Sequence, residues 1–458
     1  MLEARIPPLN HRPVSGEPKG GSPRVRRSRP LVVALALGVL GAAVLPLSSG
    51  CLRQSQVMST VPSVAADSSG AAASPEVAAA ASIAPGSQVT TPTSRSRIAL
   101  GRAIFFDPAL SEPPGTSCAS CHVPERAFSG NNGSPIGVAQ GSRSHHFARR
   151  NSPSLLYLKY VPRFHFYASD DAIQPSPFGG FFWDGRADSI VEVVREPLLD
   201  PNEMNNRDVS QIVRKIVSGR YAADFRREFG DVFSDPQATV TALGRAVEAF
   251  LTGDDMAPFS SRYDAYVRGE AKLTALEARG LKLFKDPDKG NCVSCHRVYD
   301  TSKNPERSLF TDFGYDAVAV PRNWKIPANA DPEHFDLGLC ERRDDRTPSN
   351  DEMWCASFRT PSLRNVAVRD SFMHNGVFTS LRDAVAFYAT RATDPMRWYE
   401  SRVKFEDVPP KYRRQVNVNS IPYNRRNGDE PALAEADVDA IVAFLLTLTD
   451  AAYRDVAH

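Results

Sequence analysis

The spacing of apolar positions along the chain predicts helices and gives no sign of a long strand. Apolar residues recur three and four positions apart, the period of a helix with one buried face, in four stretches. These stretches are 209–217, 240–251, 381–389 and 435–447. A shorter helix is expected over 188–195, where Pro197 should end it because proline lacks the N–H donor that a helix needs. The chain is therefore expected to be mainly α, with long ordered loops.

The first fifty residues have the pattern of an export segment (residues 1–50). Four closely spaced arginines lie between positions 24 and 29, and an apolar run follows over 31–47. A basic flank before an apolar run of this length is typical of a signal peptide or a membrane anchor, since a full span needs about 20 residues. We therefore expect a periplasmic protein.

Cys51 offers a second way of holding the chain at a membrane. Small residues precede it, as they do where a lipid is added to a new amino terminus, but Leu47 lies one position further away than is usual at such sites. Lipidation of Cys51, cleavage elsewhere and an uncleaved anchor over 31–47 stand as alternatives. Residues 51–95 are rich in Ala, Ser, Pro, Val and Thr and contain no aromatic residue, which is typical of a flexible tether.

Length and charge set broader bounds. A chain of 458 residues can hold two or three domains, and the folded part is expected to begin near Ser96. The net charge of +2 at pH 7 indicates neither a nucleic acid nor a strongly acidic partner. Four of the seven cysteines lie in two copies of one motif.

That motif, C-x-x-C-H, is the strongest chemical signal in the sequence. Its copies are Cys118, Cys121 and His122, and Cys292, Cys295 and His296. Two thiols at this spacing can form thioethers with the vinyl groups of one haem, and the histidine then lies under the ring as an iron ligand. Zinc is the alternative for a single copy, but no second C-x-x-C pair follows either copy to complete four ligands. The sequence therefore predicts two covalently bound c-type haems.

The residues before each motif repeat as well. Residues 101–108 and 280–287 share Gly, Phe, Asp and Pro in the same register. Self-similarity of this kind is the mark of a duplicated unit. Each unit is expected to carry a short amphipathic helix, a loop and the haem motif. We divide the folded part into a first haem domain over 96–270 and a second over 271–458.

These motifs and several others together resemble the bacterial di-haem cytochrome c peroxidases and their relatives of the MauG type. The resemblance extends from about Ser96 to Asp450. The matching runs are 118–122, 150–153, 182–186, 202–204, 292–296, 358–366, 373–376 and 443–446. It implies two cytochrome c-like domains, with peroxide chemistry at the first haem and electron handling at the second.

The resemblance also implies roles for Trp183 and Glu203. Trp183 matches a tryptophan that lies between the two haems, although a large core residue is its ordinary alternative. Glu203 matches an acid above the first iron, where it would take a proton from one peroxide oxygen and return it to the other. A solvated turn residue after Pro201 is the ordinary alternative for Glu203.

On the far side of the second haem, peroxidases of this family place a methionine, whereas MauG-type members place a tyrosine. Tyr388 falls at this position, and no methionine occurs between Met373 and Met396. A tyrosine oxygen favours ferric and higher states of iron, whereas a thioether favours the ferrous state. The alternatives are a core role for Tyr388 and ligation by Met373, which lies in the turn beside His374.

A calcium ion lies between the haems in this family. Asn151 matches its side-chain ligand, and Arg369 and Ser371 match positions that supply backbone carbonyls. The family usually has Thr and Pro at these last two positions, so this chain departs from the pattern there. Because carbonyl ligands tolerate substitution and calcium prefers oxygen ligands, the resemblance still implies a calcium site.

Three further histidines and two cysteines complete the candidates. His145 and His146 lie where peroxidases of this family carry a mobile distal histidine, but their setting does not match and a surface loop accounts for them. His374 matches a histidine near the second haem, where a hydrogen bond is expected rather than ligation. Cys340 and Cys355 flank a polar loop, and a disulfide there would contribute about 3 kcal/mol; free thiols are the alternative.

We therefore expect an exported di-haem oxidoreductase that reacts with hydrogen peroxide. Its electrons would come from a small donor protein, a c-type cytochrome or a cupredoxin, through the second haem and Trp183. One alternative is a MauG-like oxidase of a protein substrate, which uses the same haem chemistry. The other is a pure electron carrier with no open iron site.

Overall fold

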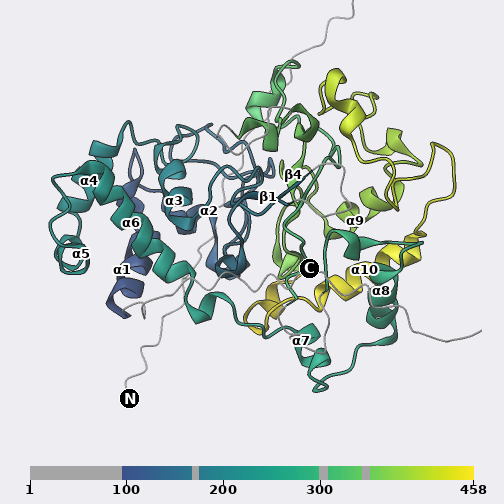
Figure 1. The fold of residues 1–458 in the computed structure, drawn as a ribbon, viewed down its shortest axis with the longest axis horizontal. Helices are drawn as coiled ribbons and strands as arrows, with labels where there is room; N and C mark the ends of the chain where they lie inside the picture. Colours follow the sequence, from purple (N-terminus) through teal and green to yellow (C-terminus); the bar gives the residue numbers. More distant parts are fainter. Residues whose placement is uncertain (1–94, 168–174, 299–307, 343–350, 458) are drawn as a thin grey trace, which may run out of the picture. The chain divides into compact units, whose positions relative to one another are not determined.

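The computed structural model describes residues 95–167, 175–298, 308–342 and 351–457. Helices dominate this part of the chain, which confirms the expected mainly α fold (Figure 1). The helices are α1 Arg95–Phe105, α2 Cys118–Cys121, α3 Ile190–Leu199, α4 Val209–Ser218, α5 Ala222–Phe229, α6 Pro236–Leu251, α7 Arg262–Val267, α8 Ala275–Lys285, α9 Leu381–Thr390 and α10 Glu435–Leu446. The export segment, Cys51 and nearly all of the tether lie outside the described residues.

The described residues include four strands that apolar alternation did not predict. β1 (His165–Tyr167) pairs antiparallel with β2 (Ser176–Phe178), and β3 (Tyr315–Asp316) pairs antiparallel with β4 (Phe358–Arg359). Strands of two or three residues are too short to show a period of two. An isolated bridge between Phe178 and Gly314 links the two ribbons.

Side-chain caps set the starts of the main helices. Ser189, Asp208, Asp235 and Ser380 each accept a hydrogen bond from a backbone N–H in the first turn of α3, α4, α6 and α9. The expected end of α3 at Pro197 is wrong, because the helix continues to Leu199. Only two helical residues follow the proline, so its missing N–H removes a single bond near the end of the helix, and the Asn206 side chain caps the Leu198 carbonyl oxygen at 2.8 Å where the helix ends.

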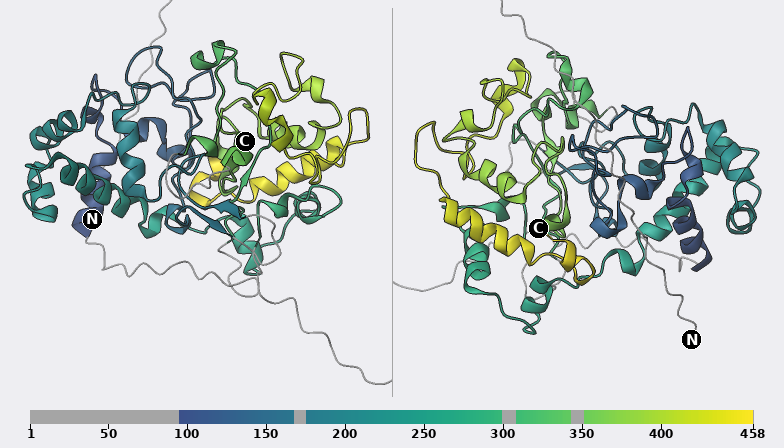
Figure 2. Two further views of the ribbon diagram at one scale, coloured as in Figure 1. Left: turned by 45° about the horizontal axis from the view of Figure 1, so that its top comes forward. Right: turned by 180° about the vertical axis from the view of Figure 1, so that it is seen from behind.

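Two helix pairs repeat the duplication seen in the sequence. α1 packs on α6, and α8 packs on α10, which Figure 2 shows from a second side. A Cβ atom on Gly101 would lie 1.8 Å from the Ala246 carbonyl oxygen, and one on Gly280 would lie 1.9 Å from the Ala440 carbonyl oxygen. The repeated glycine is therefore required for close helix packing.

The aromatic residue of the repeat has the same place in both pairs. The ring centroids of Phe105 and Phe250 lie 5.4 Å apart, and those of Phe284 and Phe444 lie 5.3 Å apart. Phe105 belongs to a hydrophobic cluster built mainly from residues 100–256, and Phe284 to a cluster built mainly from residues 263–448. Each duplicated unit therefore has its own core.

Buried polar contacts join the chain end to the first unit. Asp450 accepts hydrogen bonds from Tyr157 Oη at 2.6 Å and Asn365 Nδ2 at 2.7 Å. Arg364 forms a fully buried ion pair with Asp264 at 2.8 Å.

Within the described ranges, no helix has both the length and the apolar character that crossing a bilayer requires.

Cys340 and Cys355 form a disulfide, with their Cα atoms 4.8 Å apart. The favoured alternative for this pair is therefore confirmed. Ala319 and Tyr412 pack with the two cysteines in a third, small hydrophobic cluster. The disulfide thus anchors a loop to the second unit.

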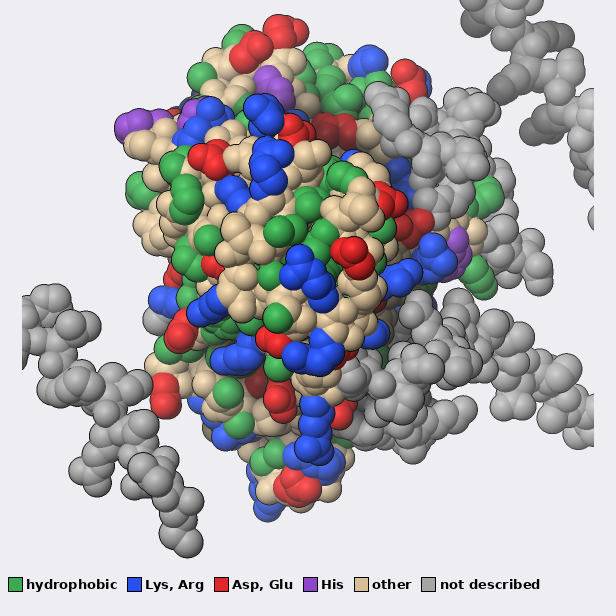
Figure 3. Space-filling view, turned by 90° about the vertical axis from the view of Figure 1, so that its left-hand side faces the viewer, with side chains coloured by type: hydrophobic (Ala, Val, Ile, Leu, Met, Phe, Trp, Pro, Cys, Tyr) green, Lys and Arg blue, Asp and Glu red, His purple; other side chains and the backbone are tan. Residues whose placement is uncertain are grey.

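The surface carries both signs of charge. On the side of α4 and α5, basic and acidic side chains alternate with apolar ones, and neither sign forms a large patch on the face drawn in Figure 3. Arg227 and Asp224 on α5, for instance, form an exposed ion pair at 2.6 Å. This mixture agrees with the small net charge.

Candidate functional site

The first C-x-x-C-H motif forms a short helix that ends at its histidine. Ser117 and Ser120 close the start of α2, and the backbone N–H of His122 donates to the Cys118 carbonyl oxygen at 2.9 Å. His122 Nδ1 lies 3.0 Å from the Pro153 carbonyl oxygen and 3.2 Å from that of Phe128. Because carbonyls only accept, Nδ1 carries the proton and Nε2 keeps its lone pair. Burial lowers the pKa of His122 to about 4, so the ring is neutral.

The second motif repeats this arrangement. The backbone N–H of His296 donates to the Cys292 carbonyl oxygen at 2.7 Å, and Nδ1 donates to the Phe310 carbonyl oxygen at 2.9 Å. Burial likewise lowers the pKa of His296. Both histidines therefore present Nε2 as a free ligand atom, held in orientation by a backbone carbonyl.

The thiols and histidines of both motifs fit covalent attachment of a haem, and the second motif also lines a cavity. The four motif thiols take part in no disulfide, and burial raises the pKa of each to about 12, so they are neutral thiols. A largely apolar cavity of about 260 Å³ lies at the second motif. Its lining includes Cys292, Cys295, His296 and side chains from α9. An apolar cavity with a few polar groups is what a cofactor site requires.

Glu203 lies near the first motif, and its carboxylate is not engaged in a hydrogen bond within the described part of the chain. Its carboxylate raises the pKa of both Cys118 and Cys121, so it lies close enough to the two thiols for its charge to act on them. Backbone bonds fix the turn, since Glu203 N donates to Asp200 O at 3.0 Å and Ser142 N donates to Glu203 O at 2.7 Å.

The pKa of Glu203 is raised to about 7. Burial is the main cause, and the nearby charge of Asp200 adds to it, while Arg186 acts in the opposite direction. A carboxyl with this pKa can both take and return a proton near neutral pH, which a solvated turn residue with an ordinary pKa cannot do efficiently. The environment thus supports the catalytic alternative for Glu203.

Trp183 lines the cavity of the second motif, and its side chain is half-buried. Its indole Nε1 donates to the Asn151 carbonyl oxygen at 2.8 Å, and its own carbonyl accepts from Arg359 N at 2.7 Å. Asn151 lies two residues before Pro153, whose carbonyl oxygen accepts the hydrogen bond from His122 Nδ1. Trp183 therefore contacts the segment that orients the first histidine while facing the second cavity.

Tyr388 on α9 lines the same cavity as His296. Burial raises the pKa of Tyr388 above the usual range, and the proximity of Cys295, Asp316 and Cys292 raises it further, which indicates that the side chain lies near both thiols. The ring stacks on Tyr423 with centroids 6.0 Å apart. Met373 also lines this cavity, so the structure brings both candidate ligands to one site.

The remaining histidines take different positions. His145 is exposed, as a surface loop predicts, whereas His146 Nδ1 lies 3.2 Å from Oδ1 of Asn202, the neighbour of Glu203. The ring of His374 is buried and stacks on Phe358 with centroids 3.6 Å apart. Burial lowers the pKa of His374 to about 4, so the ring is neutral.

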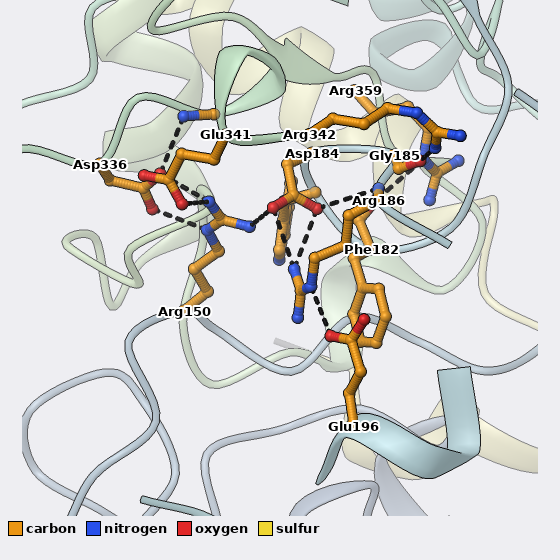
Figure 4. Close-up of polar contacts among 12 residues, drawn as sticks. Arg150, Phe182, Asp184, Gly185, Arg186, Glu196, Asp336, Glu341, Arg342 and Arg359 are labelled. Carbon is orange, nitrogen blue, oxygen red and sulfur yellow. Dashed lines mark hydrogen bonds and ion pairs between the residues drawn. The ribbon is translucent and has the colours of Figure 1, made fainter. Parts of the chain in front are cut away.

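A charged network follows directly from the Trp183 segment (Figure 4). Arg150 donates to Asp184 at 2.5 Å and to both carboxylate oxygens of Asp336 at 2.7 and 2.6 Å. Asp184 also accepts from Arg186 at 2.9 Å. Arg150 lies in the first unit and Asp336 in the second, so this network fixes the two units around Trp183.

The candidate calcium ligands lie together, but the positively charged side chain of Arg369 already contacts the backbone carbonyls there. Asn151 Nδ2 donates to the Ser371 carbonyl oxygen at 3.0 Å. Arg369 Nε donates to the same oxygen at 3.3 Å, and its Nη2 donates to the Ser152 carbonyl oxygen at 3.0 Å. Burial lowers the pKa of Arg369 to about 10, so it remains positively charged at neutral pH.

With the guanidinium of Arg369 on these carbonyls, the site does not fit calcium. An ion on the Ser371 carbonyl would lie within roughly 6 Å of the guanidinium, a repulsion of about 5 kcal/mol at an effective dielectric constant of about 20, before solvent screening. Within the described ranges, no cluster of three His, Cys, Asp or Glu side chains could hold a metal. The buried Oδ1 of Asn151 has no hydrogen-bond partner there and remains an acceptor beside the arginine.

Sequence reasoning missed a second internal repeat. Ser154 Oγ donates to the Ala127 carbonyl oxygen and Ser362 Oγ donates to that of Leu309, each at 2.6 Å. Both serines sit in the run Pro-Ser-Leu, at 153–155 and 361–363, and both bonds tie that run to the chain after a haem motif. Comparing the two halves beyond the motifs would have shown this signal.

Comparisons with known proteins agree with this geometry. Residues 95–272 match a family model described as di-haem cytochrome c peroxidase. The methylamine utilization protein MauG of Paracoccus denitrificans is 36% identical over 371 residues, which cover 79% of this chain and 91% of that protein. Cytochrome c551 peroxidase of Pseudomonas aeruginosa is 29% identical over 299 residues, 64% of this chain and 72% of that enzyme.

A solved structure is more similar still. The diheme peroxidase BthA from Burkholderia thailandensis is 57% identical with a TM-score of 0.76, covering 80% of this chain and 88% of that one. A variant of BthA with one tyrosine replaced by methionine matches equally well, with 58% identity and a TM-score of 0.77. The likeness therefore covers both halves of the described chain.

Proposed function

The chain belongs to the family of di-haem cytochrome c peroxidases and MauG-type enzymes, and from this membership we propose that it is an exported oxidoreductase that reacts with hydrogen peroxide at its first haem site. Members of this family are oxidoreductases with two c-type haems. The single observation that carries the proposal is an asymmetry. Both sites hold a neutral histidine in the same way, but Glu203 stands at the first and Tyr388 at the second.

We assign the haem attachments by residue. Cys118 and Cys121 would hold the first haem with His122 as its iron ligand, and the second motif would do the same with Cys292, Cys295 and His296. The matched hydrogen bonds of the two histidines support this assignment. The domain division at 270 and 271 is proposed on the two hydrophobic clusters and the extent of the family match.

At the first site Cys118, Cys121 and His122 would hold the haem, which would supply the iron for the reaction with peroxide. Glu203 would accept a proton from the oxygen nearer the iron and return it to the departing oxygen, which leaves as water. Reduction of hydrogen peroxide to two waters requires two electrons and two protons. The turn bonds that fix Glu203 would keep its carboxyl aimed at the site while the proton is held.

At the second site Tyr388 and His296, which line one cavity, would both be ligands of the haem iron. A neutral thioether would favour reduced iron, whereas a tyrosine oxygen favours ferric and higher states. Trp183 would carry electrons between the sites, because it faces the second cavity and contacts the segment that holds His122. The hydrogen bond from its indole Nε1 to the Asn151 carbonyl oxygen would hold the ring in one orientation.

A MauG-like oxidation of a protein substrate is the second candidate. The observation that favours it is Tyr388 in the second cavity, since a tyrosine would help to hold two oxidising equivalents in the enzyme. In that case oxidisable residues of a partner protein would supply the two electrons. In the peroxidase case a small donor protein, a c-type cytochrome or a cupredoxin, would supply them.

We place the protein in the periplasm, because covalent haem attachment of this kind takes place outside the cytoplasm. The basic and apolar pattern over 1–47 supports export. A tether through residues 31–47 or a lipid on Cys51 would hold it at the membrane. Fractionation of cells with and without a Cys51→Ala change separates these two tethers.

Stopped-flow mixing of the ferric holoprotein with one equivalent of hydrogen peroxide tests the proposal. An enzyme of this kind should show a rapid change in the Soret band that returns when reduced cytochrome c or cupredoxin is added. A pure electron carrier should show no rapid change, which would contradict the proposal.

A further inference from the structure

We infer that the guanidinium group of Arg369 supplies a fixed positive charge between the two haem sites, at the position where a calcium ion is expected from the family. Arg369 would thus be a positioning residue that acts on the haems through its charge. The inference rests on the two haem attachments proposed above.

The hydrogen bonds of Arg369 place the charge in the backbone that joins the two units. Its Nη2 donates to the carbonyl oxygen of Ser152, in the segment that orients His122. Its Nε donates to the carbonyl oxygen of Ser371, which also accepts from Asn151 Nδ2. Backbone carbonyls and an amide oxygen are hard oxygen donors of the kind that calcium takes. Here an arginine nitrogen contacts these carbonyls directly.

Arg369 faces both candidate haem sites. Its charge is felt at His122, where it disfavours protonation of the ring. It also lines the cavity that holds His296 and Tyr388. A charge in this position acts on both irons, because low-dielectric surroundings screen it weakly.

The charge is not neutralised by a close ion pair within the described part of the chain. Among the described residues, the carboxylate of Asp370 stabilises the charged form of Arg369. The Asp370 carboxylate, however, pairs with Arg126 at 3.1 Å. A net positive field therefore remains at the haem sites, and it should favour the reduced state of each iron and attract anionic haem propionates.

Arginine suits this role because its charge is permanent and its planar fork can donate to several carbonyls at once. A bound ion can be removed by a chelator, whereas a side chain cannot. The two designs therefore differ in a measurable way.

Metal analysis of the purified holoprotein is the first test. We expect no stoichiometric calcium, and EDTA should leave the ferric EPR spectrum and the haem potentials unchanged. One tightly held calcium per chain, whose removal alters the EPR spectrum, would overturn the inference. A count of two covalent haems in the same sample tests the haem attachments separately.

Potentiometric titration of Arg369 variants is the second test. Arg369→Gln removes the charge and should lower both haem reduction potentials. Arg369→Lys keeps the charge, so its two haem potentials should stay near those of the wild type. The matched control is Arg207→Gln, because Arg207 is exposed and, among the described residues, pairs with its neighbour Asp208. Wild-type potentials in Arg369→Gln would rule out the charge effect. The lysine variant keeps the test valid if the glutamine variant folds poorly.

Arg369→Thr is the third test, since threonine is the usual residue of the family at this position. We expect this variant to gain a calcium-dependent shift of the haem potentials that EDTA reverses. Indifference to calcium would show that Arg369 does not stand in for a bound ion.

Discussion

The indole Nε1 of Trp183 donates a hydrogen bond to the backbone carbonyl oxygen of Asn151 at 2.8 Å. Two residues further along, the Pro153 carbonyl accepts from His122 Nδ1 at 3.0 Å. Trp183 itself lines the cavity that contains His296. One short segment thus links the orientation of the first histidine to the tryptophan that faces the second site.

The holoprotein should carry two haems that acid-acetone cannot extract. Each motif supplies two thiols for thioether bonds and a neutral histidine whose Nδ1 is already engaged. The double change Cys292→Ser and Cys295→Ser should leave one covalent haem, measured by pyridine haemochrome after extraction. Equal loss of both haems in that variant would point to misfolding, and the reciprocal change at the first motif is its check. Extractable haem in the unchanged protein would contradict the attachment.

Glu203→Gln should slow the reaction with peroxide by about 10²–10⁴-fold, because it keeps the shape of the side chain and removes its base. Stopped-flow rates at saturating peroxide measure this. Glu125→Gln is the control, since Glu125 is exposed and belongs to the same half of the chain. A wild-type rate in Glu203→Gln would exclude Glu203 as the proton carrier.

The peroxide reaction should depend on pH through the same carboxyl. Burial raises the pKa of Glu203 to about 7, and only the ionised form can accept a proton. The rate should therefore fall as the pH drops below about 7 and level off above it. Glu203→Gln should remove this one-proton step. A step that persists in the variant belongs to another group.

Tyr388→Met should introduce the near-infrared charge-transfer band that methionine ligation gives to ferric haem, and the unchanged protein should lack it. The reason is that Tyr388 lies near both thiols of the second motif. Met373→Leu is the matched control, because Met373 lines the same cavity and should leave the ferric spectrum unchanged. A methionine band in the wild type that Met373→Leu abolishes would assign the ligand to Met373.

Gly280→Ala should destabilise the second unit by about 1–3 kcal/mol through overpacking. A Cβ atom there would lie 1.9 Å from the Ala440 carbonyl oxygen, so α8 must move away from α10. Thermal unfolding followed by circular dichroism measures the loss. Leu276→Ala on the exposed side of α8 is the control and should change stability by less than about 1 kcal/mol. Equal effects of the two changes would mean that the close helix contact is not required.

Local pattern was sufficient for much of the fold. Helical spacing predicted α4, α6, α9 and α10, because a helix with one buried face places apolar residues three and four positions apart in the sequence. The duplicated glycine and phenylalanine predicted two equivalent units, and the structure gives them equivalent helix contacts. Pro197 shows the limit, since the helix continues two residues beyond it before the Asn206 side chain caps the Leu198 carbonyl oxygen.

Long-range pairing was decided only by the tertiary structure. The C-x-x-C-H spacing by itself predicts the haem chemistry of His122, but not that Pro153 orients its ring. The raised pKa of Glu203 depends on its burial and on the charges that folding brings near it. Likewise, a sequence comparison shows that Arg369 departs from the family, but only the folded chain shows its guanidinium on the Ser371 carbonyl. The physical reason is that periodicity and motif spacing act between near neighbours in the chain, whereas burial and charge act between neighbours in space.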